Sequence, residues 1–76
     1  MILPTKHIPV ENALLGVGAS LLGELTRPRT VTALWERVRH RPEVGSFLRF
    51  TLALDLLFAI GAVELQDGLL KRTSVG

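Results

Sequence analysis

The chain has 76 residues and a mass of 8.3 kDa, so it forms one small domain, and a large enzyme core with an enclosed cleft is excluded. Because it contains no cysteine, a disulfide framework and a thiolate zinc site are also excluded. Hydrophobic residues make up 47% of the sequence and the formal net charge is only +2, while a domain of this size buries about 60% of its surface, so we expect a partner to cover part of the apolar excess.

Residues 1–10 are predicted to form an extended N-terminal arm. Pro4 and Pro9 lie among apolar residues there, and proline disfavours the helical conformation of the residue before it. The opening has no charged region followed by an apolar core and a cleavage site, so it is not a signal peptide and we expect a cytoplasmic protein. The apolar stretch 47–65 contains three charged side chains, which argue against a transmembrane helix and a membrane partner.

Residues 11–25 are predicted to form the first helix, because leucine and valine recur there at intervals of three and four. The opposite side carries a row of small residues, Ala13, Gly16, Ser20 and Gly23. A mid-helix glycine costs about 1 kcal/mol relative to alanine, so the row needs a reason. Either a neighbouring element of the same fold packs closely there, or Gly16, Ser20 and Gly23 form a docking face for another chain.

Two further helices follow. Thr30 is suited to cap the second helix, and Pro42 prevents that helix from continuing. Ser46 is suited to cap a third helix that runs from residue 47 to about residue 60 and ends at Gly61. The expected inward stripe of the third helix consists of Phe47, Phe50, Leu54, Leu57 and Phe58.

The residues after the third helix predict a β-hairpin. Residues 62–65 and 69–72 flank a turn that contains Asp67 and Gly68, and both of these residue types tolerate positive φ. Three helices followed by a hairpin are typical of a winged helix-turn-helix domain, with the hairpin as the wing. The predicted fold class is therefore mainly α with a C-terminal β-hairpin, divided into an arm (1–10), a winged-helix domain (11–72) and a frayed tail (73–76).

The chain offers few groups for catalysis. His7 and His40 lie on different elements with no partner at metal-ligand spacing, and no glycine cluster fits a phosphate-binding loop. Asp55 is the best candidate for a perturbed carboxylate, and we expect it to pair with a nearby arginine or a backbone donor. We therefore expect no enzyme activity, no metal and no cofactor.

Basic residues gather in the middle of the chain. Six of the nine lysines and arginines lie between positions 27 and 49, where only two glutamates oppose them. Such a segment can contact phosphate or an acidic partner, and it can equally be a solvated face. The candidate phosphate contacts are Arg37, Arg39, Arg41, Arg49, Lys71 and Arg72.

The outward face of the third helix indicates whether the protein recognises DNA bases or binds another protein. Its predicted outward face consists of Arg49, Leu52, Leu56, Ala59 and Ile60. Only the arginine can hydrogen-bond to a base edge, so sequence-specific readout is disfavoured. A helix that is apolar on nearly all sides must be buried on nearly all sides, and we expect Leu52, Leu56 and Ile60 to meet another protein chain. Alternatively, the arm of residues 1–10 folds over this face within the monomer.

Five segments carry a resemblance to a known family: residues 3–7 (LPTKH), 28–31 (PRTV), 34–36 (LWE), 53–63 (ALDLLFAIGAV) and 68–70 (GLL). Together they resemble the small middle components of ATP-binding-cassette three-component systems. The resemblance implies an SMC- or Rad50-like ATPase and an effector subunit as partners, and a role in bacterial defence against invading DNA. It implies no catalytic residues.

The resulting hypothesis is a non-enzymatic winged-helix adaptor that docks onto a larger ATPase or effector complex. The alternatives are a winged-helix module that contacts DNA phosphates without sequence specificity, and a homodimeric regulator that uses the same apolar face. A DNA contact should weaken steeply with salt, which separates it from apolar docking.

Overall fold

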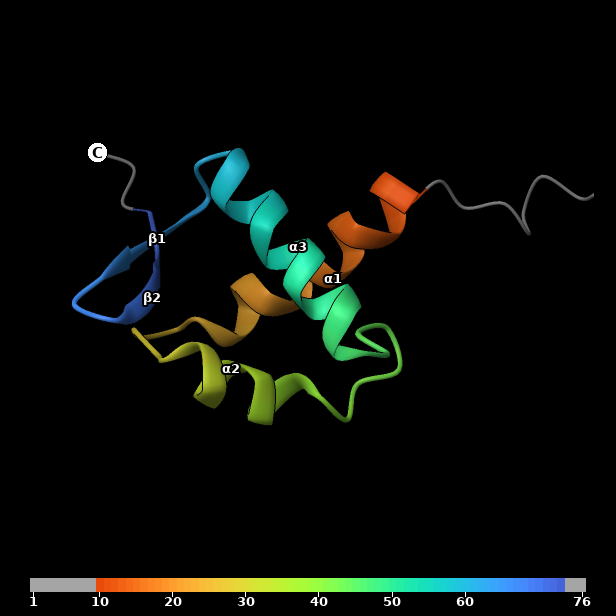
Figure 1. Ribbon diagram of the computed structural model, residues 1–76, viewed down its shortest axis with the longest axis horizontal. Coiled ribbons are helices and arrows are strands. Elements are labelled where there is room, and N and C mark those ends of the chain that lie inside the picture. Colours follow the sequence, from red (N-terminus) through yellow and green to blue (C-terminus); the bar gives the residue numbers. More distant parts are fainter. Residues whose placement is uncertain (1–9, 74–76) are drawn as a thin grey trace, which may run out of the picture.

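The computed structural model describes residues 10–73. Within this range the chain is mainly helical and ends in a two-stranded antiparallel sheet, as the sequence predicts (Figure 1). The elements are α1 (Val10–Glu24), α2 (Val31–Val38), α3 (Phe47–Ala59), β1 (Val63–Gln66) and β2 (Leu69–Arg72). Residues 1–9 of the predicted arm and residues 74–76 of the predicted tail lie outside the described residues.

Side-chain caps fix the starts of the second and third helices. The Thr30 hydroxyl accepts a hydrogen bond of 3.0 Å from the Ala33 N–H, and the Ser46 hydroxyl accepts one of 3.1 Å from the Arg49 N–H. Each hydroxyl satisfies one of the N–H groups that the first turn of a helix leaves without a backbone partner. Both predicted caps are confirmed.

The hairpin closes on a two-residue turn. Asp67 and Gly68 have φ values of 55° and 78°, and Gln66 pairs with Leu69 on either side of them. Two consecutive positive φ values match the twist of the flanking strands, which explains the Asp-Gly pair. On the edge of β2 that does not pair with β1, Leu70 exchanges two backbone hydrogen bonds of 3.0 and 2.6 Å with Arg29. This short bridge joins the segment before α2 to the hairpin.

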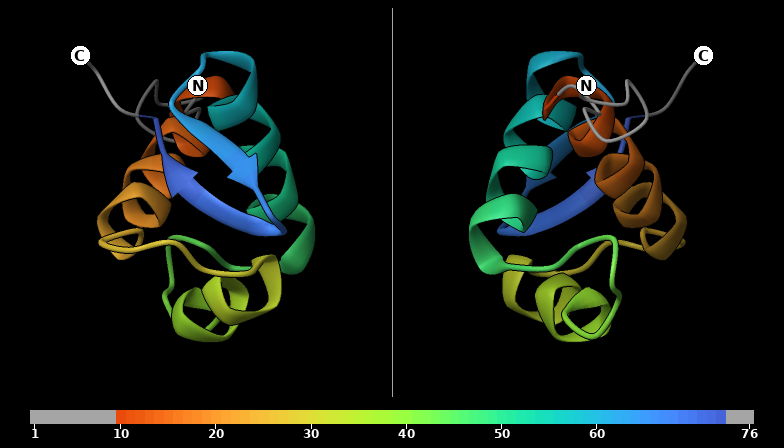
Figure 2. Two further views of the ribbon diagram at one scale, coloured as in Figure 1. Left: turned by 90° about the vertical axis from the view of Figure 1, so that its left-hand side faces the viewer. Right: turned by 90° about the vertical axis from the view of Figure 1, so that its right-hand side faces the viewer.

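The three helices enclose the core together with one face of the hairpin. Seen from the hairpin end, α1 and α3 lie on two sides and α2 lies below them (Figure 2). All three helices, the loop before α3 and both strands contribute buried side chains. These are Val17, Leu21, Leu25, Leu34, Val38, Val44, Phe50, Ala53, Leu54, Leu57, Val63 and Leu70. This is the winged helix-turn-helix arrangement that the element order predicts.

Two phenylalanines of the predicted inward stripe of α3 lie elsewhere. Phe47 and Phe58 are exposed, and Ala53 is buried in their place. At about 100° per residue, both phenylalanines stand at the edge of the stripe that Phe50 and Leu57 define. Phe47 packs edge-on against Trp35, with ring centroids 5.1 Å apart, and stacks on Phe50 at 5.7 Å, but about half of its surface stays exposed. The prediction that Phe47 and Phe58 point into the core is therefore wrong.

The row of small residues on α1 is not a packing contact within the described part of the fold. No described atom lies within 4 Å of a Cβ built on Gly16 or Gly23. The close approach occurs at Gly18, where a Cβ would stand 3.1 Å from Cδ2 of Leu57 in α3. The prediction of close packing at Gly16 and Gly23 by a neighbouring element is therefore wrong for residues 10–73, and the close contact between α1 and α3 lies at Gly18 instead.

The helices are short compared with a membrane-spanning helix, and the longest of those described, α1, has 15 residues. α3 has 13 residues, and no helix in the part of the chain that the structure describes is long and apolar enough to cross a bilayer.

The different surroundings of Gly16 and Gly18 predict different changes in stability when each is replaced by alanine. Gly16→Ala should stabilise the fold by up to about 1 kcal/mol, because it raises helix propensity without meeting a neighbour. Gly18→Ala gains the same propensity but must displace the Leu57 side chain, so we expect it to be the less stable variant of the two. Urea unfolding at equal protein concentration measures both changes. Equal stabilisation by the two variants would contradict the close approach of α1 and α3.

Candidate interaction surfaces

The outward face of α3 is apolar except for one carboxylate. Leu48, Leu52, Asp55 and Ala59 follow one another at intervals of four and three residues, which places them on one stripe of the helix. All four are exposed, and the exposed fractions of Leu48 and Leu52 are 67% and 43%. The stripe points away from α1 and the core because Phe50, Ala53 and Leu57 occupy the opposite side of the helix. We call these four residues the α3 stripe.

The predicted outward residues flank this stripe. Ile60 is 60% exposed just after α3, Leu56 is half-buried, and Arg49 is exposed near the start of the helix. Leu48 was not among the predicted partner-binding residues, although it lies one helical turn before Leu52 and the spacing alone points to it. The alternative cover, the arm of residues 1–10, lies outside the described residues except for Val10, the first residue of α1.

The chemistry of the α3 stripe does not suit a base-reading helix. The Thr51 hydroxyl beside it donates to the Leu48 carbonyl oxygen at 2.9 Å, so its proton is already used within the helix. Asp55 brings a negative charge to the centre of the stripe, where it repels phosphate. We expected Asp55 to be paired with an arginine or a backbone donor. Within residues 10–73 that prediction is wrong, because Asp55 is exposed and forms no ion pair or side-chain hydrogen bond there.

The predicted docking residues of α1 do not join the α3 stripe. Gly16 and Gly23 are exposed, and the spacing of Gly16 and Gly18 turns them about 200° apart around the helix. Since Gly18 faces α3, Gly16 and Gly23 face away from it. Ser20 is engaged within the chain, because its hydroxyl donates to Oε2 of Glu43 at 2.8 Å. The two predicted sets of partner-binding residues therefore lie on different surfaces.

One carboxylate organises the basic residues at the end of α1. Glu24 accepts a hydrogen bond of 2.7 Å from Nε of Arg37, and its other oxygen pairs with Arg41. Its side chain is only 16% exposed, and its backbone carbonyl accepts from Nε of Arg29 at 2.8 Å. The hydrogen bond from Arg37 and the charges of Arg41, Arg37 and Arg29 lower the pKa of the Glu24 carboxyl, although desolvation opposes them.

Positive charge remains in excess around Glu24. Burial lowers the pKa of the Arg29 guanidinium, and the nearby charges of Arg37 and Arg27 lower it further. Three arginines contact the side chain or backbone of a single carboxylate residue, so their combined charge is not neutralised. The sequence did not reveal Glu24 as the centre of this cluster, because its partners are 13 and 17 residues away along the chain.

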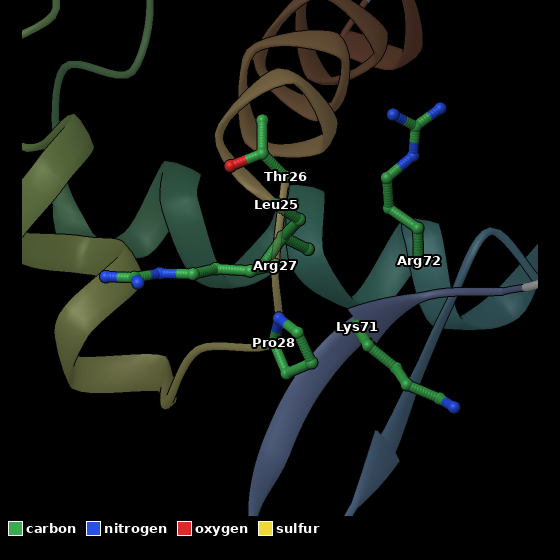
Figure 3. A pocket seen from close by; sticks show the side chains of 6 residues that line it. All are labelled: Leu25, Thr26, Arg27, Pro28, Lys71 and Arg72. Carbon is green, nitrogen blue, oxygen red and sulfur yellow. The ribbon is translucent and has the colours of Figure 1, made fainter.

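A shallow basic hollow adjoins this cluster. It has a volume of about 300 Å³ and lies between the end of α1 and strand β2 (Figure 3). The side chain of Arg27 extends toward α2, whereas those of Lys71 and Arg72 extend along other directions. Lys71 is paired with Glu64 at 3.2 Å. The lining consists of Leu25, Thr26, Arg27, Pro28, Lys71 and Arg72.

The predicted phosphate contacts are divided by the fold. Arg37 and Arg41 lie at Glu24, while Lys71 and Arg72 line the hollow. Arg39 instead pairs with Glu36 at 3.2 Å on the exposed surface of α2, and Arg49 lies at the start of α3. The structure adds Arg27 and Arg29 to the basic cluster. The described residues hold no group of three histidine, cysteine or carboxylate side chains that could bind a metal.

A sequence model of the family described as ABC-three component (ABC-3C) system Middle Component 6 matches residues 3–73. The match includes all three helices and the hairpin. It confirms the resemblance to the middle components of ATP-binding-cassette three-component systems. No curated protein and no solved structure matches the chain.

Replacement of Glu24 should make the fold less stable in a pH-dependent way. A carboxyl with a lowered pKa in the folded chain stabilises the fold above its unfolded pKa, and this contribution is lost as the pH falls through the folded pKa. Glu24→Gln should therefore lower the melting temperature at pH 7, and the deficit should shrink below the ordinary carboxyl pKa of 4.5. Thermal unfolding followed by circular dichroism at pH 7 and pH 3 measures the change.

The matched control is Glu36→Gln, which breaks the exposed pair with Arg39 and should leave the melting temperature nearly unchanged. If Glu24→Gln had the same deficit at both pH values, its ionised carboxylate would not be the stabilising group.

Proposed function

The chain belongs to the ABC-three component (ABC-3C) system Middle Component 6 family, and we propose that it serves there as a non-enzymatic adaptor that docks through the α3 stripe onto the ATPase component. The proposed ATPase is SMC- or Rad50-like, and the proposed setting is bacterial defence against invading DNA. In this proposal the middle component contributes only a binding surface, and its partner carries out the ATP hydrolysis.

The exposure of the α3 stripe carries the proposal. Leu48 and Leu52 stand in solvent on the helix that a DNA-binding winged helix would insert into the major groove, and Ile60 extends the apolar surface past the end of α3. Full burial of a leucine or isoleucine contributes about 1.5–3 kcal/mol before the cost of association is subtracted. Apolar anchors of this kind supply affinity in protein interfaces.

Asp55 adds a condition on the partner. It is a carboxylate in the middle of an apolar stripe, and burying it without a counter-charge would cost more than the neighbouring leucines return. The surface of the ATPase that meets the stripe should therefore present apolar side chains around one arginine or lysine. A second copy of this chain or the effector subunit are the competing occupants of the same face.

The proposal is tested by co-expression with the other two components of the system and affinity purification of a tagged ATPase. Leu52→Asp should abolish recovery of the middle component, because it places a second carboxylate beside Asp55 in the interface. Leu65→Asp is the matched control, since Leu65 is a leucine on strand β1 that is even more exposed than Leu52 (57% against 43%) and lies outside the α3 stripe. That variant should be recovered like the unaltered chain.

The competing readings give other results. Equal recovery of Leu52→Asp and the unaltered chain would reject docking through the α3 stripe. Sedimentation of the isolated chain distinguishes the homodimer, because a dimer that Leu52→Asp converts to monomer would assign the stripe to a second copy. Recovery with the effector subunit in the absence of the ATPase would assign the contact to that subunit.

A further inference from the structure

The charges of this protein are segregated onto one side of the fold. The Glu24 cluster and the hollow together hold six of the nine lysines and arginines, but only three of the seven carboxylates: Glu24 and Glu64 form ion pairs there, and Glu43 lies within electrostatic range of Arg41. The rest of the sequence has more carboxylates than cations, although the whole chain is positive. We call the six cations the basic strip: Arg27, Arg29, Arg37, Arg41, Lys71 and Arg72.

Backbone and side-chain contacts link the members of the basic strip. Arg37 and Arg41 share the carboxylate of Glu24, and Arg29 binds the backbone carbonyl of the same residue. The backbone of Arg29 is bridged to Leu70 of β2, next to Lys71, so the Glu24 cluster and the hollow are joined through the sheet. Elements far apart in the sequence thus contribute to one cationic surface.

Part of this charge is available to a ligand. Glu24 and Glu64 engage Arg37, Arg41 and Lys71, whereas no described carboxylate forms an ion pair with Arg27 or Arg72. Both of these arginines are exposed at the hollow. Six cations held near three carboxylates repel one another, and a bound polyanion would relieve that repulsion.

The basic strip and the α3 stripe lie on different sides of the molecule. In the view into the hollow, α3 passes behind the end of α1 and the hairpin (Figure 3). The hollow is therefore on the core-facing side of α3, and the α3 stripe points the other way. A ligand on the basic strip leaves the α3 stripe free for a protein.

We propose that the basic strip binds the phosphate backbone of duplex nucleic acid without sequence specificity. Five of its six cations are arginines, whose planar guanidinium groups match phosphate oxygens. The surface is open and shallow, and none of the exposed large hydrophobic residues lines the hollow. An acidic protein partner would need such apolar anchors, whereas a phosphate backbone needs only accessible positive charge. In this proposal the duplex lies against the basic strip, whereas a base-reading winged helix would place α3 in the major groove.

The test uses the full chain and a fluorescently labelled 30-base-pair duplex of mixed sequence, with anisotropy measured between 50 and 200 mM salt. The observed affinity should fall steeply with salt. Each phosphate contact that forms on binding releases about 0.9 counterion, so the double variant Arg27→Gln/Arg72→Gln, which loses two contacts, should make the slope of log K against log salt less steep by about 2. The matched control Arg39→Gln/Arg49→Gln removes the same charge outside the basic strip and should keep the original slope.

Several results would overturn the proposal. They are the absence of binding at 50 mM salt, an equal loss of slope in the two double variants, and tighter binding to polyglutamate than to the duplex at equal ionic strength. Circular dichroism verifies that both double variants fold. Leu52→Asp should bind the duplex like the unaltered chain, so a failure of docking through the α3 stripe and a failure of phosphate binding are measured separately.

Discussion

The close approach of α1 and α3 is the constraint on which the remaining surfaces depend. At Gly18 the backbone of α1 comes so near to α3 that a single Cβ would stand 3.1 Å from the Leu57 side chain. On the side of α3 that faces α1, Phe50, Ala53 and Leu57 enter the core, whereas Leu48, Leu52 and Asp55 remain in solvent. The exposed apolar face of α3 is thus a consequence of how the helix is packed.

The same packing separates two kinds of surface. Apolar residues with a single carboxylate occupy the outer side of α3, while Glu24 gathers arginines from α2 and from the segment after α1 on the other side. A winged helix that read DNA through its third helix would combine both functions on one face. Here the proposed adaptor surface and the proposed phosphate-binding surface are separate, so a protein and a nucleic acid could occupy them together.

Local sequence signals were sufficient where a residue acts on its immediate neighbours. Thr30 and Ser46 cap the turns that follow them, and Asp67 and Gly68 form the turn in which they lie, because each of these interactions spans at most three residues. Local signals were not sufficient to predict which residues at the edge of the buried face of α3 are covered. Phe47 and Phe58 have the right spacing and hydrophobicity for burial, but the reach of the neighbouring elements decides whether a residue at the edge of the stripe is covered.

The sequence by itself determined the order of three helices and a hairpin, the absence of cysteine chemistry and an apolar third helix, because these follow from composition and periodicity. Only the tertiary structure decided that Gly18, rather than Gly16 or Gly23, is the close contact, and that Asp55 is unpaired among the described residues. It also decided that Glu24 binds Arg37 and Arg41. These outcomes depend on distances between segments that are far apart along the chain, and spacing within one segment carries no information about them.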